Sequence, residues 1–387
     1  MDELSWPAIL ARAIWQFLPV WIALAATFAV SIRYRRRLAL YGRLFDSNVG
    51  MTGFAIVMFW VFTALFADLV ITQDPLAQIS GMKNALPGTP VGGDGSGGYP
   101  YYLLGGDSLA RDVFSRMVMG AREVLKIAPA ATVFAFMVGI TLGLPAGYFA
   151  GSFDIALTFL ANLVLAFPVI LLFYLLVTPE IVSTGIPMMF AAVLFIFPIL
   201  FFCVLVNSRF RTVPWKRNLY LALVLVLGLW IYSGLAFNRD PLGLFHMDPN
   251  LLNVFVSVVF VNSPGVFRIV RGLAMDIKVR DFVAAGQTRG EGPWYIMLWE
   301  ILPNARGPLI VDFCLRIGYT TILLGTLGFF GLGVSTESPD WGSTINIGRR
   351  LLAIYPHPAL VPALALMSLV LGLNLLADGL REESLRD

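Results

Sequence analysis

The sequence is short of charge and of the residues that carry most enzyme chemistry. Only 13% of its 387 residues are Asp, Glu, Lys or Arg, whereas 58% are hydrophobic, and it has two cysteines and two histidines. A soluble protein of this length needs a more charged surface, so the composition excludes that class. The net charge of +3 is small and is spread over a few loops, which excludes a nucleic-acid-binding surface.

Motifs for catalysis and nucleotide binding are also missing. The chain has no HExxH, CxxC or Ser/His/Asp arrangement, and no Gly-x-x-x-x-Gly-Lys-Ser/Thr loop to hold a phosphate. We therefore expect no enzyme activity, no metal and no cofactor in this chain. Cys203 and Cys314 lie in apolar runs and are expected to be buried free thiols. His246 and His357 fall in predicted outer loops as surface residues, although imidazole ligands for nickel are an alternative.

Long apolar runs dominate the sequence, and its mean hydropathy is +0.79. Most of the runs have the length that a helix needs to cross a bilayer, about 20 residues. They predict an all-α, polytopic membrane protein with about nine transmembrane helices. The runs cover approximately residues 9–32, 51–71, 124–150, 155–177, 185–206, 219–237, 251–270, 305–333 and 358–377.

Basic residues indicate which connections face the cytoplasm. Arginines at 33 and 35–37 follow the first run, while the start of the chain is acidic, so we expect an outer N-terminus and a cytoplasmic C-terminus. Four basic residues between 209 and 217 place the connection between the fifth and sixth runs inside. Residues 72–106 form a Gly- and Pro-rich outer loop, in which 92–98 has the composition of a flexible spacer.

A polar stretch at 271–304 separates two of the apolar runs and predicts a helix, a turn and a second helix. Val279, Phe282, Val283 and Gly286 fall on one stripe of the first helix. Glycines at 290 and 292 end that helix, and Pro293 suits the first turn of the next.

The second helix is expected over residues 294–302. Trp294, Met297, Leu298 and Ile301 follow the spacing of one helical face, before Pro303 stops the helix. We expect this face to lie along a membrane surface or a partner.

This stretch resembles the EAA loop of bacterial ABC-importer permeases, specifically the second permease subunit of the oligopeptide, dipeptide and nickel group. The family loop reads roughly EYVEAARALG and ends in ILPN; here residues 281–286 read DFVAAG and 301–304 read ILPN. The motif's glutamate is Ala284 here and its second alanine is Gly286. The resemblance implies that 271–304, the coupling loop, docks on a cytoplasmic ATPase. The implied coupling residues are Arg280, Asp281, Phe282, Val283, Ala284, Ala285, Gly286, Gly290, Leu302, Pro303 and Asn304.

Further segments resemble the same family over most of 104–178 and 251–381. The most specific is 104–125, which reads LGGDSLARDVFSRMVMGAREVL. Two regions have no counterpart in the family, and they lead us to expect four parts: an additional N-terminal helix and basic loop (1–48), the first part of the permease domain (49–179), an inserted hairpin (180–250), and the second part of the permease domain (251–387).

The resemblance implies a permease subunit of an ATP-driven importer in a bacterial inner membrane, moving peptides or another small solute such as nickel, an opine or a sugar. Its implied partners are a homologous permease, two ATPases that hold ATP and Mg²⁺, an extracytoplasmic solute-binding protein that contacts outer loops including 72–106 and 334–357, and membrane lipid. The alternatives are an ion-coupled secondary transporter and a membrane scaffold without transport.

Two features inside the predicted bundle have open interpretations. Gly139, Gly143, Gly147 and Gly151 recur every four residues, which favours close helix packing over a pore lining. Asp312 and Arg316 are four residues apart and can pair on one helix face. They line the translocation path or a subunit interface, or they form a local ion pair.

Overall fold

The computed structural model describes residues 3–35, 41–42, 44–92, 99–237, 239–240, 242–243, 248–332 and 338–384. Arg36, Arg37, His246 and most of the predicted spacer lie outside these ranges. In the described part of the chain the only strands are β1 (Thr89–Pro90) and β2 (Tyr101–Tyr102), which pair antiparallel. The all-α prediction is therefore confirmed.

The described residues contain seven helices that are long and apolar enough to cross a membrane, together with two sharply bent helix pairs. Counting each pair as one span gives the nine predicted. The first pair is α1 (Trp6–Gln16) and α2 (Leu18–Tyr34), bent by 57°, and the second is α7 (Ser152–Leu165) and α8 (Val169–Val177), bent by 84°.

The prediction of continuous helices over 9–32 and 155–177 is therefore wrong, and proline accounts for both bends. Pro19 lies in the first turn of α2, where it has no N–H to donate to the preceding turn. Pro168 precedes α8 in an extended conformation and disfavours helical geometry at Phe167.

The chain divides into two compact units. Unit 1 comprises residues 1–129 and 314–387, and unit 2 comprises residues 130–313. Two long helices, α6 (Val113–Phe149) and α17 (Arg306–Phe329), each contribute residues to both.

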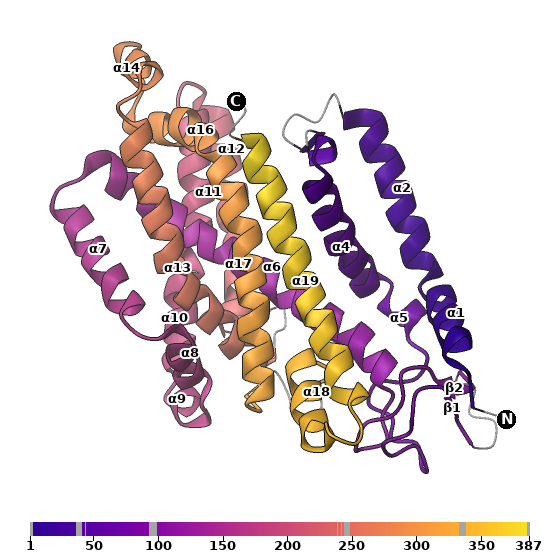
Figure 1. Cartoon of the computed structure of the whole chain (residues 1–387). Helices are drawn as coiled ribbons and strands as arrows, with labels where there is room; N and C mark the ends of the chain where they lie inside the picture. Colours follow the sequence, from indigo (N-terminus) through magenta and orange to yellow (C-terminus); the bar gives the residue numbers. More distant parts are fainter. Residues whose placement is uncertain are drawn as a thin grey trace. The chain divides into compact units, whose positions relative to one another are not determined.

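Unit 1 is built around α4 (Asn48–Leu65) and α19 (His357–Ser384), which lie side by side (Figure 1). A Cβ at Gly53 would collide with the backbone of α19, so this glycine permits the close approach. Trp60 Nε1 also donates to Ser368 Oγ at 2.9 Å. The shorter elements of the unit are η2 (Leu44–Asp46), α5 (Ala67–Val70), α18 (Trp341–Gly348) and η4 (Arg349–Leu351).

The segment that leads into α6 carries a buried polar network within unit 1. Asp112 is fully buried and accepts hydrogen bonds from the hydroxyls of Thr72 at 2.7 Å and Ser115 at 2.6 Å. Burial raises the pKa of the Asp112 carboxyl above its ordinary value. Arg116, also fully buried, donates to Thr344 Oγ1 at 3.2 Å and 3.1 Å. These bonds satisfy polar groups that would otherwise be costly to bury.

Unit 2 packs the second half of α6 against α13 (Pro249–Ile277) through glycines. A Cβ at Gly139 would lie 2.5 Å from Val266 Cγ1, and one at Gly143 would lie 2.9 Å from Val270 Cβ. Gly147 contacts the backbone of α13 in the same way. Gly151 differs from the prediction, because it lies beyond the end of α6 with φ 80° and nothing near its missing Cβ.

The rest of unit 2 includes the hairpin predicted at 180–250. Its elements are α9 (Pro179–Ser183), α10 (Ile186–Leu194), α11 (Ile196–Arg209) and α12 (Pro214–Phe237). α10 and α11 together form a single apolar span of 24 residues, and α12 forms the next.

Candidate functional site: the coupling loop

The polar segment 271–304 folds at one end of unit 2, beyond α13 (Figure 1). After α13 ends at Ile277 come α14 (Asp281–Thr288), a turn, α15 (Pro293–Tyr295), the π-helical η3 (Ile296–Ile301) and α16 (Leu302–Asn304). The predicted helix–turn–helix is therefore present. The prediction that Pro303 stops the second helix is wrong, because Pro303 lies in the first turn of α16, where no N–H is needed.

The turn between the two helices is closed by Gly290, whose φ is 79°. Its N–H donates to Gln287 O at 2.9 Å, and the N–H of Glu291 donates to Gly286 O at 3.3 Å. This pair of bonds is the Schellman motif, which satisfies the last carbonyls of α14 and requires a residue that tolerates positive φ. Pro293 then begins α15, as predicted.

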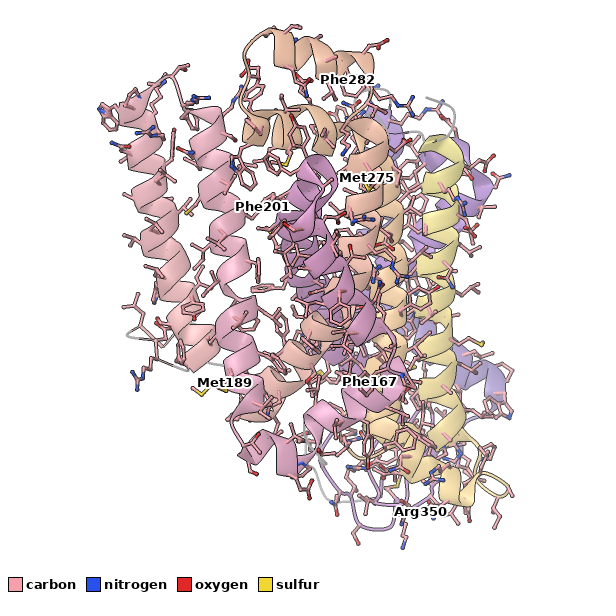
Figure 2. All side chains as sticks on the ribbon, turned by 90° about the vertical axis from the view of Figure 1, so that its left-hand side faces the viewer. Phe167, Met189, Phe201, Met275, Phe282 and Arg350 are labelled. Carbon is pink, nitrogen blue, oxygen red and sulfur yellow. The ribbon has the colours of Figure 1, made fainter. Side chains whose placement is uncertain are left out.

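α14 has one buried face and one exposed face. Val283 and Gly286 are buried, whereas Asp281, Ala284 and Ala285 are exposed. Phe282 is 38% exposed and lies at the extreme end of the unit (Figure 2). The structure thus presents a short helix with a small, largely uncharged outer surface.

The stripe predicted for α14 needs a correction. Val279 precedes the first residue of the helix and is 75% exposed, so it does not belong to the buried face. A helical spacing in the sequence cannot show where the helix starts.

The second helix of the coupling loop is buried in its own unit. Ile296, Met297, Leu298 and Ile301 are at most 6% exposed and pack in a cluster with residues of α6, α13 and α17. The expectation that this face lies along a membrane surface or a partner is therefore wrong, and Trp294, predicted on the same face, is 41% exposed.

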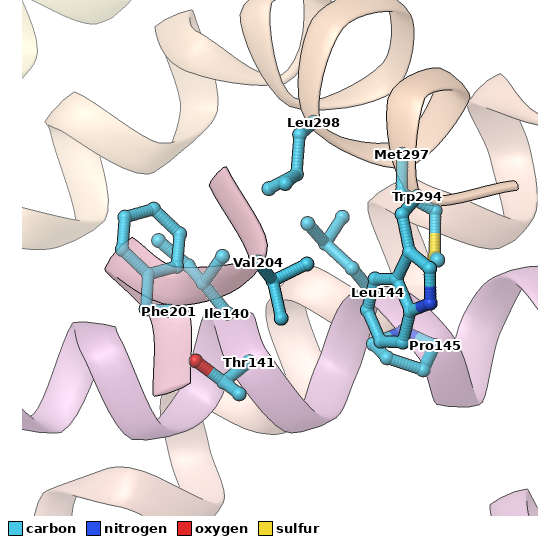
Figure 3. Close-up of a pocket in the computed structure, with 9 residues that line it drawn as sticks. All are labelled: Ile140, Thr141, Leu144, Pro145, Phe201, Val204, Trp294, Met297 and Leu298. Atoms are coloured by element: carbon cyan, nitrogen blue, oxygen red, sulfur yellow. The ribbon is translucent and has the colours of Figure 1, made fainter. Parts of the chain in front are cut away.

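Residues of α6 and α11 complete this packing (Figure 3). Ile140 and Leu144 of α6 and Val204 of α11 surround Met297 and Leu298, and the space left between them is only ≈ 20 Å³. This volume has room for about one water molecule, so the face of the second helix that meets α6 and α11 is closely packed.

Polar contacts tie α14 to the end of α6 and to the second helix. Lys278 Nζ donates to Gly147 O at 2.8 Å, and Gln287 Nε2 donates to the Tyr148 hydroxyl at 3.2 Å. The lysine is favourably placed because helix C-terminal carbonyls carry partial negative charge. Arg289 forms an ion pair of 2.7 Å with Glu300.

The end of α11 also contacts the coupling loop. Trp299 Nε1 donates to Ser208 Oγ at 3.1 Å, and the Arg209 guanidinium lies 4.9 Å from the centre of the Trp299 ring. The sequence did not predict this contact, because no motif within the segment 180–250 links it to the coupling loop. Trp299 and Arg209 can both be read from the sequence, but no sequence pattern indicates that their side chains are in contact.

The ends of α6, α11 and α13 therefore meet at the same end of unit 2. The charge pattern and the resemblance predict a cytoplasmic position for two of the connections that leave these ends, at 209–217 and 271–304.

The remaining predicted residues lie as follows. Leu302 is half-buried, Pro303 and Asn304 are exposed, and Asn304 Nδ2 donates to Glu300 O at 2.6 Å. Asp312 and Arg316 are both half-buried on α17, four residues apart, and their role stays a prediction.

The histidine and cysteine predictions have mixed outcomes. His357 is only 9% exposed, and its Nε2 lies 3.2 Å from Gly106 O, so its assignment as a surface residue is wrong. Cys314 is buried as expected, whereas Cys203 is half-buried. No group of three metal-ligating side chains occurs within the described ranges.

A set of long apolar helices, with one short exposed helix at the end of unit 2, is the architecture of a polytopic membrane protein. Residues 139–382 match the family described as binding-protein-dependent transport system inner membrane component, and the chain belongs to this family. It is a permease component, as the resemblance implied, and membership sets aside the secondary-transporter and scaffold alternatives.

Curated relatives agree with this assignment. The chain is 30% identical to a glutathione transport system permease protein of Pectobacterium atrosepticum over 73% of this chain and 71% of that protein. It is 26% identical to a dipeptide transport system permease protein of Alkalihalophilus pseudofirmus, covering 88% and 87% of the two chains. It is also 27% identical to a di/tripeptide transport system permease protein of Pseudomonas aeruginosa, covering 91% and 93%.

Proposed function

We propose that this protein is the permease subunit of an ATP-driven importer of short peptides, and that α14 receives the force of ATP hydrolysis from a separate subunit. The observation that carries the proposal is the contrast within the coupling loop: α14 exposes Phe282, Ala284 and Ala285, while the helix behind it is buried among three others. The names of the relatives, which transport glutathione, dipeptides and tripeptides, support the peptide class of cargo.

The proposed assembly contains a homologous permease, two ATPases holding ATP and Mg²⁺, and an extracytoplasmic solute-binding protein. It lies in a bacterial inner membrane, with the coupling loop and the C-terminus in the cytoplasm and the N-terminus outside. Residues 180–250 are an insertion in the shared frame. Asp312 and Arg316 belong to the translocation path.

The geometry supports a transmission route from α14 into the bundle. The ATPase contact is made mainly by shape and apolar surface, because Ala284 stands where the family motif has a glutamate. Since the buried face of the second coupling helix packs directly against α6 and α13, a displacement of α14 moves α6 and α13 with it. Rigid-body motion of packed helices of this kind is a common mode of alternating access.

A Gly290→Pro substitution tests this function in the assembled transporter. Proline cannot adopt φ 79° and removes the N–H that donates to Gln287 O. The turn that ends α14 is therefore disrupted and α14 changes its position, while the buried helices keep their packing. We expect the transporter to assemble and its ATPase subunits to hydrolyse ATP while peptide uptake is lost, and deletion of 282–286 to act alike. Gly185→Pro, at another positive φ in unit 2 but outside the coupling loop, is the matched control, since it likewise removes an N–H that donates to the preceding turn. Unchanged uptake in Gly290→Pro would contradict the proposal.

A further inference from the structure

The connection between α11 and α12 forms a pocket with the coupling loop. The pocket has a volume of ≈ 410 Å³ and is lined on one side by Ser208, Arg209 and Arg211, and on the other by Glu291, Trp294 and Tyr295. All of these residues belong to unit 2. Nothing in the proposed transport cycle uses this pocket.

The pocket has the charge of an anion site. Arg209, Arg211, Lys216 and Arg217 lie within residues 207–218, which contain no Asp or Glu. Glu291 is the one acidic side chain that lines the pocket, so the charged lining residues sum to two positive and one negative. A cluster of four basic residues beside a membrane span is typical of contact with anionic lipid.

Two guanidinium groups are already positioned at the pocket. Arg209 lies 4.9 Å over the Trp299 ring, in a cation–π arrangement that restricts its motion. Arg211 Nη1 lies 3.0 Å from the position that a Cβ of Gly292 would occupy, so it rests against the backbone of the coupling loop. Planar guanidinium groups donate paired hydrogen bonds to phosphate oxygens, and Ser208 adds a hydroxyl nearby.

The pocket lies where two lipid-facing helices end. In the most apolar stretches of the spans 186–209 and 214–237, only 17% and 11% of the residues are buried within the chain. These are the lowest fractions among the seven unbroken candidate spans of the described residues. Both helices therefore expose apolar surface in this chain, which we place against lipid hydrocarbon, so that the segment joining them lies at the level of lipid headgroups. Trp294, which is 41% exposed, and Tyr295 are residue types enriched at that level.

We propose that this pocket binds the phosphate headgroup of an anionic phospholipid and that the bound lipid steadies the coupling loop. The headgroup would bridge α11 and the second coupling helix through Arg209 and Arg211. The binding itself depends only on the pocket, whereas the effect on coupling rests on the proposed function. Loss of the headgroup would loosen the Arg209–Trp299 contact and make force transmission from α14 less efficient.

The test compares lipid retention by the purified transporter with that of variants. The wild type, Arg209→Gln/Arg211→Gln and the control Arg217→Gln are reconstituted in bilayers containing phosphatidylglycerol and phosphatidylcholine, and co-purified lipid is measured. Arg217 is a matched control because it belongs to the same basic cluster but lies in the first turn of α12, outside the pocket lining, where it donates to Asn218 Oδ1 at 3.3 Å. We expect the double variant to lose selective phosphatidylglycerol retention by about tenfold, while the control retains it.

Equal phosphatidylglycerol retention by the wild type and the double variant would overturn the site. A loss of retention in Arg217→Gln as large as that in the double variant would also overturn it, and would indicate binding to nonspecific surface charge. Competition by inorganic phosphate alone, at concentrations that displace phosphatidylglycerol, would overturn the lipid source and point to a soluble phosphate. Lipid retention is measured without ATP, and peptide uptake is measured separately. A wild type that retains phosphatidylglycerol selectively but imports no peptide therefore supports the pocket and contradicts only the proposed transport function.

Discussion

The guanidinium of Arg289 lies 2.7 Å from the carboxylate of Glu300, and so joins the end of α14 to the buried helix that follows. Their side chains are 55% and 22% exposed, so the pair contributes little to stability. It nevertheless spans the turn between the two helices of the coupling loop. We expect it to hold the angle between these two helices.

We expect Arg289→Ala to lower peptide uptake several-fold while changing the free energy of unfolding by less than about 1 kcal/mol. The charge-swapped double variant, Arg289→Glu with Glu300→Arg, should regain part of the uptake because it restores an attractive pair. Uptake into proteoliposomes and thermal unfolding of the same preparations check both statements. A loss of uptake that only follows a loss of folded protein would refute this role.

The glycines of α6 give a prediction about stability. Gly139→Ala and Gly143→Ala place a methyl group against α13, and each should destabilise the protein by about 1–3 kcal/mol. Gly272→Ala on α13 is the control, because nothing lies within 4 Å of its missing Cβ. There the higher helix propensity of alanine should leave stability unchanged or raise it by up to about 1 kcal/mol. Unfolding midpoints in detergent measure the three variants, and equal effects at all three positions would contradict the packing argument.

Asp112 gives a prediction about pH. Burial raises the pKa of its carboxyl in the folded protein above the value of 3.8 that it has when unfolded. The unfolded chain therefore releases this proton at lower pH than the folded protein. The contribution of Asp112 to stability is complete below pH 3.8 and decreases as the pH rises through the folded-state pKa.

The change Asp112→Asn removes this dependence, so the variant should gain stability relative to wild type between acidic and neutral pH. Melting temperatures of both proteins across that range check the sign of the difference. A relative loss of stability by Asp112→Asn with rising pH would show that the carboxylate is stabilised in the fold.

Local chemistry explains most of what the sequence predicted correctly. Gly290 and Pro293 each act through their own backbone geometry, so the end of α14 and the start of α15 could be placed from residue type alone. The spacing of Gly139, Gly143 and Gly147 likewise predicts a face that a neighbouring helix approaches closely. In each case the information lies within a few neighbouring residues.

The predictions that failed depend on contacts between distant segments. Helical spacing identified the apolar face of the second coupling helix but not the helices that pack against it, which are α6, α11, α13 and α17. His357 was placed on the surface because it follows a loop, although its partner Gly106 lies 251 residues away. The bend at Pro168 was predictable from the proline itself, and the apolar composition around it concealed the signal.

The contact between α6 and α13 also constrains movement during transport. Where a helix backbone lies directly against the side chains of its neighbour, neither helix can slide along the other without a collision. These two helices must travel together when the bundle rearranges. The freedom to rearrange is then left to joints where helices do not interlock in this way, and the 84° corner between α7 and α8 is such a joint in unit 2.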